Sequence, residues 1–243
     1  MPLVFARNRS GTHMEDMLYY GYGAEGGVVL SAKVKLTVTG LLMAAAAAVA
    51  GLRQAPWHFL VCTALGFSWF GDALLAGYRP IVGRIRDPFV AGMAAFACAQ
   101  VAYIMAFRRS MTGMPLRHAR IPGEYLGAEV LPGLLLLFLL IGLLFWVVVV
   151  FRSPEPAILR GATLAYGLLV SAMAAHAASA AFTGSVFAWP LLFGGVLFLV
   201  SDCAIALNIF GRRLQDVKVF EAIVWGTYLP AQALLLLGTS WLY

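Results

Sequence analysis

Long apolar segments dominate the chain after residue 33. Seven of them are long enough to cross the hydrocarbon core of a bilayer as helices, which takes about 20 residues each. Pro, Gly and Arg interrupt the segments, as is typical of polar turns, and the period-two alternation of barrel strands does not occur. The pattern predicts an all-α, polytopic transmembrane helix bundle with seven spans, at residues 34–52, 57–77, 88–107, 130–151, 158–182, 186–208 and 219–242.

Residues 1–33 have a different character, with charged residues interleaved among glycine and tyrosine. They contain no uncharged apolar run of the roughly 7–15 residues that a secretory signal peptide needs. We therefore interpret residues 1–33 as a polar, Gly/Tyr-rich N-terminal arm and residues 34–243 as the transmembrane helical bundle.

The composition excludes an ordinary soluble domain. Hydrophobic residues make up 62% of the chain and charged residues 12%, against about 45–50% and about 25% in soluble proteins. The net charge of +6 is a topology signal in such a protein and does not indicate nucleic-acid binding. Lys and Arg are more frequent in the loops on the amino-terminal side, so the positive-inside rule predicts a cytoplasmic amino terminus. We expect a multi-pass protein of a bacterial-type inner (plasma) membrane.

Two aspartates lie inside otherwise apolar segments, Asp72 in the second and Asp202 in the sixth. A carboxylate within a membrane-spanning helix costs roughly 2.5–3.5 kcal/mol on insertion scales, so such residues usually face the bundle interior and mark function. Both segments run toward the cytoplasm, and both aspartates lie near the cytoplasmic end. We expect the two carboxylates to share one site in the inner leaflet. The structural alternative is that each pairs with a loop arginine such as Arg79 or Arg212.

Further polar residues accompany the aspartates. Tyr228 and Gln232 are spaced i, i+4 and therefore share one face of the last helix. Lys35 opens the first helix on the cytoplasmic side, where its ammonium, with Arg79 and Arg212, would hold an anionic headgroup. Buried Tyr and Gln side chains also form ordinary hydrogen bonds to neighbouring helices, which is the structural alternative. The candidate substrate-binding residues are Lys35, Gln100, Tyr103, Asn208, Tyr228 and Gln232.

No motif for a metal or a nucleotide occurs in the sequence. The cysteines, Cys62, Cys98 and Cys203, all lie in apolar segments and form no CxxC or Cys/His pattern. We therefore expect neither a metal site nor a cofactor.

Several segments resemble one family when they are taken in order. Residues 71–75 and 201–210 each carry one of the two aspartates, residues 99–107 carry Gln100 and Tyr103, and residues 226–232 carry Tyr228 and Gln232. Together with the start of the first helix at residues 33–37, they resemble the YhhN-type family of integral membrane proteins, whose characterised eukaryotic members are lysoplasmalogenases. The resemblance covers about residues 31–240.

The sequence departs from the family pattern in two places. Gln100 stands where the family usually has a histidine, which removes a group able to titrate near neutral pH. The family is also expected to have eight helices, one more than the seven segments predicted here. Either departure is compatible with an altered substrate, a lost activity or a misassigned start.

The resemblance implies hydrolysis of the vinyl ether bond of a lysoplasmalogen, which releases a fatty aldehyde and glycerophosphoethanolamine or glycerophosphocholine. A vinyl ether is cleaved by protonation of its β-carbon, and water then attacks the resulting oxocarbenium ion. Two carboxyl groups suit this chemistry, because one can donate the proton while the ionised other stabilises the cation and activates water. Asp72 and Asp202 are the catalytic candidates, in either order of roles. The implied partners are a lysophospholipid substrate and membrane lipid, and the oligomeric state is left open.

Two other classes of function compete with the hydrolase. A non-catalytic lipid-binding homologue is credible because of Gln100. A proton- or cation-coupled transporter would use the same acids, but it usually shows inverted repeats and helices broken near mid-membrane. The sequence has no convincing internal repeat, although Trp189-Pro190 and Leu229-Pro230 leave room for broken helices.

Overall fold

The computed structural model describes residues 32–76, 78–82, 85, 87–112, 126–182, 188–214 and 216–241. These residues form helices joined by short connections, with no strand among them. The helices are α2 (Ala32–Arg53), α3 (Pro56–Leu75), α4 (Arg79–Val82), α5 (Pro88–Thr112), α6 (Leu126–Val149), α7 (Ala157–Ala181), α8 (Trp189–Ile209) and α9 (Val217–Ser240). Within the described part of the chain, seven of them are long and apolar enough to cross a membrane, which confirms the predicted fold class.

Helix boundaries differ from the limits of the apolar segments. Helix α5 continues to Thr112, past the predicted end at residue 107, because Arg108 and Arg109 extend a helix well although they end the apolar run. Helix α3 ends at Leu75, two residues early, and the short α4 follows where only a turn was predicted. Helix α2 begins at Ala32, so the end of the predicted arm is helical. The rest of the arm and the predicted start of the sixth span, residue 186, lie outside the described residues.

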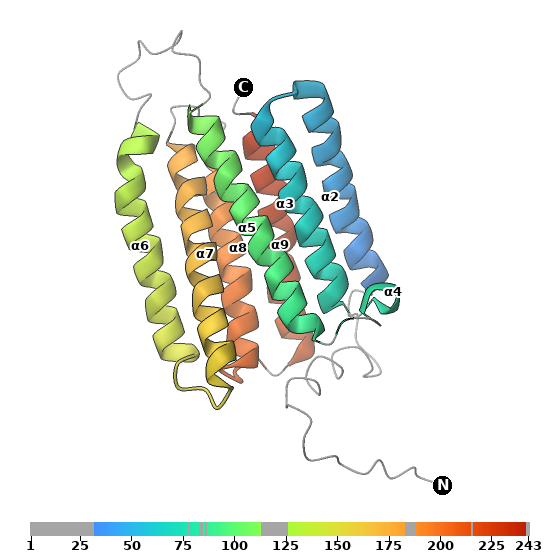
Figure 1. Ribbon diagram of the computed structural model, residues 1–243, viewed down its shortest axis with the longest axis vertical. Coiled ribbons are helices and arrows are strands. Elements are labelled where there is room, and N and C mark those ends of the chain that lie inside the picture. The colour runs from blue at the N-terminus through green and yellow to red at the C-terminus, as the bar shows by residue number, and fades with distance from the viewer. Residues whose placement is uncertain are drawn as a thin grey trace.

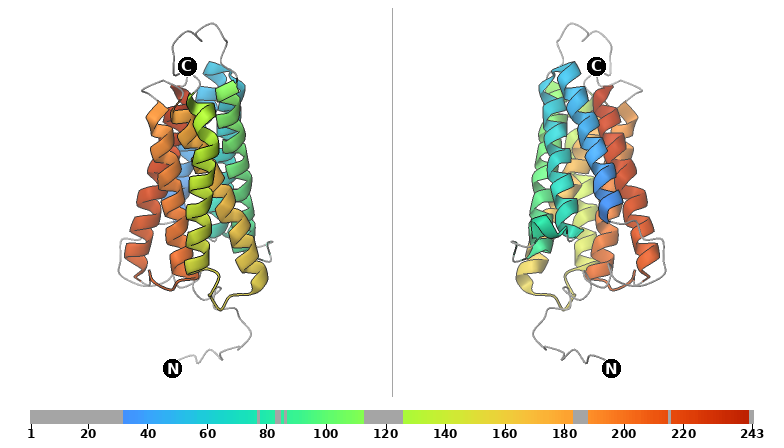
Figure 2. Two further views of the ribbon diagram at one scale, coloured as in Figure 1. Left: turned by 90° about the vertical axis from the view of Figure 1, so that its left-hand side faces the viewer. Right: turned by 90° about the vertical axis from the view of Figure 1, so that its right-hand side faces the viewer.

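Six of the long helices form a closed ring. Figures 1 and 2 show the long helices running side by side along one axis. Around the ring, α2 packs on α3, α3 on α5, α5 on α7, α7 on α8 and α8 on α9, and α9 returns to contact both α2 and α3. Helix α6 lies outside this ring and packs mainly against α7. The ring therefore has an interior that six helices can line.

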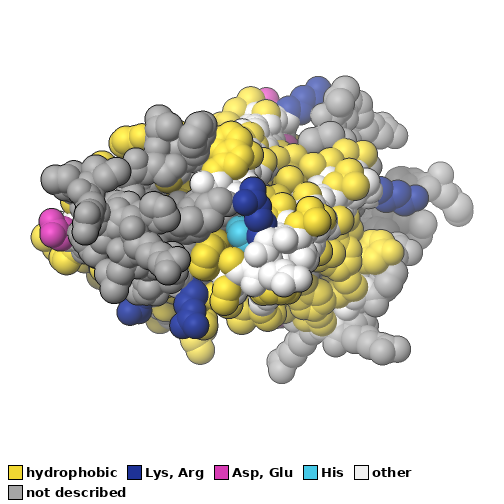
Figure 3. Space-filling view, turned by 90° about the horizontal axis from the view of Figure 1, so that it is seen from above, with side chains coloured by type: hydrophobic (Ala, Val, Ile, Leu, Met, Phe, Trp, Pro, Cys, Tyr) yellow, Lys and Arg dark blue, Asp and Glu magenta, His cyan; other side chains and the backbone are white. Residues whose placement is uncertain are grey.

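Small residues allow the helices of the ring to approach closely. A Cβ atom added at Gly195 of α8 would lie 3.1 Å from the Cα atom of Ala174 in α7. Close backbone approach through small residues is typical of helices that pack in a membrane. Apolar side chains also cover most of the described surface that is visible in the view onto the end opposite α4 (Figure 3). This surface fits a lipid environment.

Candidate active site

A cavity of about 350 Å³ lies inside the ring, in the half of the bundle nearest α4. Both Asp72 of α3 and Asp202 of α8 line it, together with residues from α2, α5, α7 and α9. The volume lies at the lower end of the range for small-molecule sites, about 300–1,000 Å³. The structure thus brings the two aspartates to one cavity, although they lie at different distances from their helix ends. Asp72 is less than one turn from Leu75, and Asp202 about two turns from Ile209.

Asp72 is held by a tyrosine from the last helix. The hydroxyl of Tyr228 donates a hydrogen bond to Asp72 Oδ2 at 3.0 Å, and only 6% of the Asp72 surface is exposed. Thr39 and Lys35 of α2 also lie close to this carboxyl group. Gly71 leaves space for an aromatic ring beside it, because a Cβ atom at this position would lie 2.7 Å from the ring of Phe96. Asp72 is therefore fixed in a tightly packed corner of the cavity.

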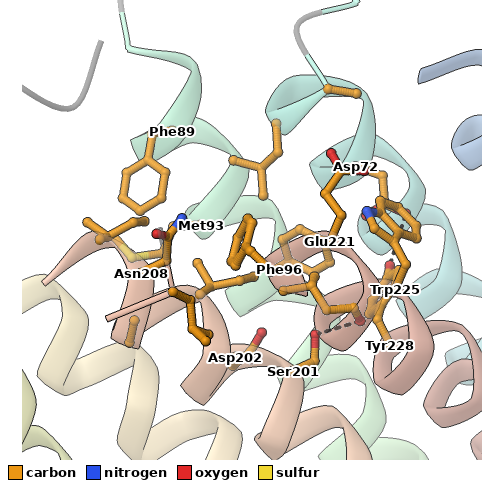
Figure 4. Close-up of a pocket in the computed structure, with 18 of the residues that line it drawn as sticks. Asp72, Phe89, Met93, Phe96, Ser201, Asp202, Asn208, Glu221, Trp225 and Tyr228 are labelled. Atoms are coloured by element: carbon orange, nitrogen blue, oxygen red, sulfur yellow. Dashed lines mark hydrogen bonds between the residues drawn. The ribbon is translucent and has the colours of Figure 1, made fainter. Parts of the chain in front are cut away.

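Asp202 has a separate tyrosine partner. The hydroxyl of Tyr166 on α7 donates a hydrogen bond to Asp202 Oδ2 at 2.9 Å. Among the described residues, no hydrogen bond joins Asp202 to Asp72 directly, and Figure 4 shows the two carboxyl groups in different parts of the pocket. The arrangement is a cavity flanked by two carboxyl groups, and a substrate group can lie between them.

A third carboxylate, which was not among the residues predicted from the sequence, also lines the cavity. Glu221 of α9 forms an ion pair with Lys35 of α2, with 2.9 Å between Oε1 and Nζ. Lys35 is buried, and its ammonium also lies 4.9 Å from the centre of the Trp225 ring. The signal for Glu221 was its spacing, because Glu221, Trp225 and Tyr228 follow one another at i, i+4 and i+7 on one helix face. Tyr166 was also missed, because a tyrosine does not stand out among the other polar residues of its span.

The substrate-binding candidates divide into two groups. Lys35, Asn208 and Tyr228 line the cavity. Gln100, Tyr103 and Gln232 are fully buried and are not among its lining residues.

The hydroxyl of Tyr103 donates a hydrogen bond to Gln232 Oε1. Gln100 lies near Tyr166, but its amide has no well-formed hydrogen bond among the described residues. These side chains support the cavity wall and do not reach its interior.

Of the two loop arginines in the structural alternative, Arg212 forms no ion pair with either aspartate among the described residues. Arg212 lines a second, separate cavity together with Arg152 and Arg213. The side chain of Arg79 lies outside the described part of the structure. Among the described residues, no group of three or more His, Cys, Asp or Glu side chains could hold a metal ion. That the site works without a cofactor stays a prediction.

Comparison with known proteins identifies the family. The sequence profile of the YhhN family matches residues 30–239. The chain belongs to the YhhN family. It is also 30% identical over 181 residues to lysoplasmalogenase TMEM86B of Sus scrofa, an alignment that covers 74% of this chain and 61% of that relative's length. No solved structure matches.

This family assignment confirms the resemblance recognised in the sequence. With seven apolar helices in the described part of its chain, the YhhN protein is a multi-pass integral membrane protein. The matched region includes both aspartates and every residue described above in the cavity wall.

Proposed function

We propose that this YhhN protein is a membrane-embedded hydrolase that cleaves the vinyl ether bond of lysoplasmalogens. The products are a fatty aldehyde and glycerophosphoethanolamine or glycerophosphocholine. The observation that supports this proposal is that Asp72 and Asp202 flank one largely apolar cavity, which suits a single-chain lipid. The activity named for the pig relative agrees with it.

The reaction needs one acid, one carboxylate and one water molecule. The protonated aspartate transfers its proton to the β-carbon of the vinyl ether, and the α-carbon becomes part of an oxocarbenium ion. The ionised aspartate stabilises this cation and accepts a proton as water adds to the α-carbon. In the hemiacetal formed in this way, the bond to the glycerol oxygen breaks as the second aspartate, now protonated, returns its proton to that oxygen. The hemiacetal hydroxyl gives its own proton to the first aspartate, which restores the acid, and the aldehyde is released. The proton balance closes, and no redox cofactor takes part.

The orientation of the bundle bears on how the substrate arrives. With the amino terminus in the cytoplasm, the cavity lies in the inner leaflet of a bacterial-type plasma membrane. A lysolipid can then enter sideways from that leaflet, with its phosphate at the headgroup level. Labelling of single cysteines introduced in the loops at the two ends of the bundle, with a membrane-impermeant reagent in intact cells, tests this orientation.

The decisive assay supplies the purified protein with choline and ethanolamine lysoplasmalogens beside matched ester lysolipids. We expect aldehyde release from the vinyl ethers and no fatty acid release from the esters. Binding of these lipids without hydrolysis would instead favour a non-catalytic lipid-binding protein. Proton or cation movement across liposomes without hydrolysis would favour a transporter.

We expect Tyr166→Phe and Tyr228→Phe each to lower kcat by roughly 10-fold. Each change removes the hydrogen bond from a tyrosine hydroxyl to a catalytic carboxyl group, and a hydrogen bond to a charged group contributes about 1.5–3 kcal/mol. Turnover per unit of monodisperse protein is the measurement. Tyr78→Phe is the matched control, because Tyr78 is exposed and lies outside the cavity lining. Equal losses in all three variants would contradict a positioning role.

We expect Gln100→His to keep or raise the turnover number. Gln100 is fully buried behind the cavity. Its amide contributes little stabilisation there, since it has no well-formed hydrogen bond among the described residues. The resemblance to the family also leads us to expect histidine there. The measurement is kcat across a range of pH. A large loss of activity in a folded variant would show that Gln100 has a role specific to this protein.

A further inference from the structure

Beside Asp72, the cavity wall carries a compact ionic cluster formed by Lys35, Glu221 and Trp225. Lys35 comes from α2, and the other two residues lie one turn apart on α9. The lysine ammonium lies 2.9 Å from a Glu221 carboxylate oxygen and 4.9 Å from the Trp225 ring centre. A carboxylate and an indole face are the groups that bind a cationic amine. In this structure, the protein's own lysine occupies the amine position.

We propose that this cluster is a headgroup subsite that selects zwitterionic lysolipids by exchanging ion-pair partners. The phosphate of the bound lipid pairs with the Lys35 ammonium. The ammonium of an ethanolamine or choline headgroup takes the place of Lys35 against Glu221 and the face of Trp225. This inference rests on the proposed function and adds that the protein recognises the headgroup of the substrate.

Burial explains why the exchange favours a zwitterion. Lys35 is 3% exposed and Glu221 15% exposed, so leaving either charge without a partner is costly. A zwitterionic headgroup brings one anion and one cation, and every buried charge then keeps a partner. A purely anionic headgroup satisfies Lys35 but leaves Glu221 unpaired beside a second negative charge. The subsite therefore discriminates through the penalty on the wrong ligand as well as through attraction to the right one.

The position of the cluster fits the chemistry beside it. The Trp225 ring centre lies 5.5 Å from that of Tyr228, and the Tyr228 hydroxyl holds Asp72. Figure 4 shows Glu221 and Trp225 grouped with Asp72, whereas Phe89 and Met93 lie at the other side of the pocket. A lysolipid bound with its headgroup at the cluster thus places its glycerol next to Asp72 and directs its chain toward the apolar side chains of α5.

A purely structural role for the ion pair, as a link between α2 and α9, makes a different prediction. Loss of such a link would lower the stability of the protein and weaken the binding of every ligand alike. Loss of a headgroup subsite changes affinity according to the charge of the headgroup. Binding of two lipids that differ only in the headgroup separates these roles.

The experiment measures dissociation constants for two non-hydrolysable probes with the same saturated ether-linked chain, 1-O-alkyl-glycerophosphocholine and 1-O-alkyl-glycerophosphate. In Glu221→Gln, we expect the choline probe to bind about 10-fold more weakly, as for the loss of one charge-assisted contact. The phosphate probe should bind equally well or more tightly, because Glu221 no longer competes with the phosphate for the Lys35 ammonium. Trp225→Leu should weaken binding of the choline probe alone, and Lys35→Met should weaken binding of both probes.

Glu155→Gln is the matched control, because it makes the same charge change outside the cavity lining. Thermal unfolding of each variant shows whether it is folded. If Glu221→Gln does not fold, the comparison of the two probes in Trp225→Leu decides. Equal weakening of both probes in a folded variant overturns the subsite and leaves the hydrolase untouched. A selective change in binding, in a protein that cleaves no vinyl ether, supports the subsite and refutes the hydrolase.

Discussion

Asp72→Asn and Asp202→Asn should each lower the turnover of a lysoplasmalogen at least about 100-fold while leaving the bundle folded. Asparagine has the shape of aspartate, and its amide oxygen still accepts a hydrogen bond from Tyr228 or Tyr166. It can neither donate an acidic proton nor carry the negative charge that stabilises the cation. General acid–base catalysis typically contributes about 10²–10⁴-fold. The measurement is aldehyde release per unit of monodisperse protein.

The control for this experiment is Glu129→Gln, which removes an exposed carboxylate at the far end of the bundle. A variant that keeps more than about a tenth of the wild-type rate, a change of roughly 1.4 kcal/mol in the barrier, is not a direct participant. The double variant adds a sharper test. If the two carboxyl groups act as a unit, it should be hardly slower than either single variant. If the rate loss in the double variant equals the product of the two single losses, the carboxyl groups act independently.

Gly195→Leu should destabilise the protein and inactivate it at the same time. The Cβ atom would lie 3.0 Å from the Cβ of Ala177 and 3.1 Å from the Cα of Ala174, so the leucine must push α8 away from α7. Overpacking of this kind costs typically about 1–3 kcal/mol. Asp202 lies about two turns further along α8, so a displaced helix also moves the carboxyl group to which we assign a catalytic role. Thermal unfolding in detergent and turnover are the two measurements.

Gly226→Leu provides the comparison for Gly195→Leu. Gly226 is exposed on α9, and no atom lies within 4 Å of a Cβ placed there. The same substitution should therefore leave the unfolding temperature nearly unchanged. If the two variants unfold alike, close packing between α7 and α8 is not what holds α8 in position.

The sequence predicts the bundle well because the length and polarity of each span are local properties. It also indicates Asp72 and Asp202, since a carboxylate in an apolar span is conspicuous by itself. The ion pair between Lys35 and Glu221 could not be predicted in this way. The two residues are 186 positions apart, and Glu221 lies near a helix start, where charged residues are common. Only the packing of α2 against α9 brings them together.

The position of a residue along its span also could not show whether its side chain lines the cavity or lies behind the cavity wall. In a soluble protein, the polar face of a helix shows which side faces water. In a bilayer, the lipid-facing side and the packed side are both apolar, so this signal is weak. Gln100 and Tyr103 were therefore placed correctly in the third span, but nothing local showed that they lie behind the cavity while Tyr228 faces it.

The contact between α2 and α9 has a consequence for the order of assembly. The wall that carries Lys35 and Glu221 joins the earliest described helix to the latest one, so it is completed only after α9 has been synthesised and inserted. Until then, Lys35 has no Glu221 to pair with, and its position near the start of α2 allows its ammonium to reach the aqueous boundary. A chain terminated before α9 would keep both aspartates and five of the six ring helices, but its ring would remain open on the side that carries the proposed headgroup subsite.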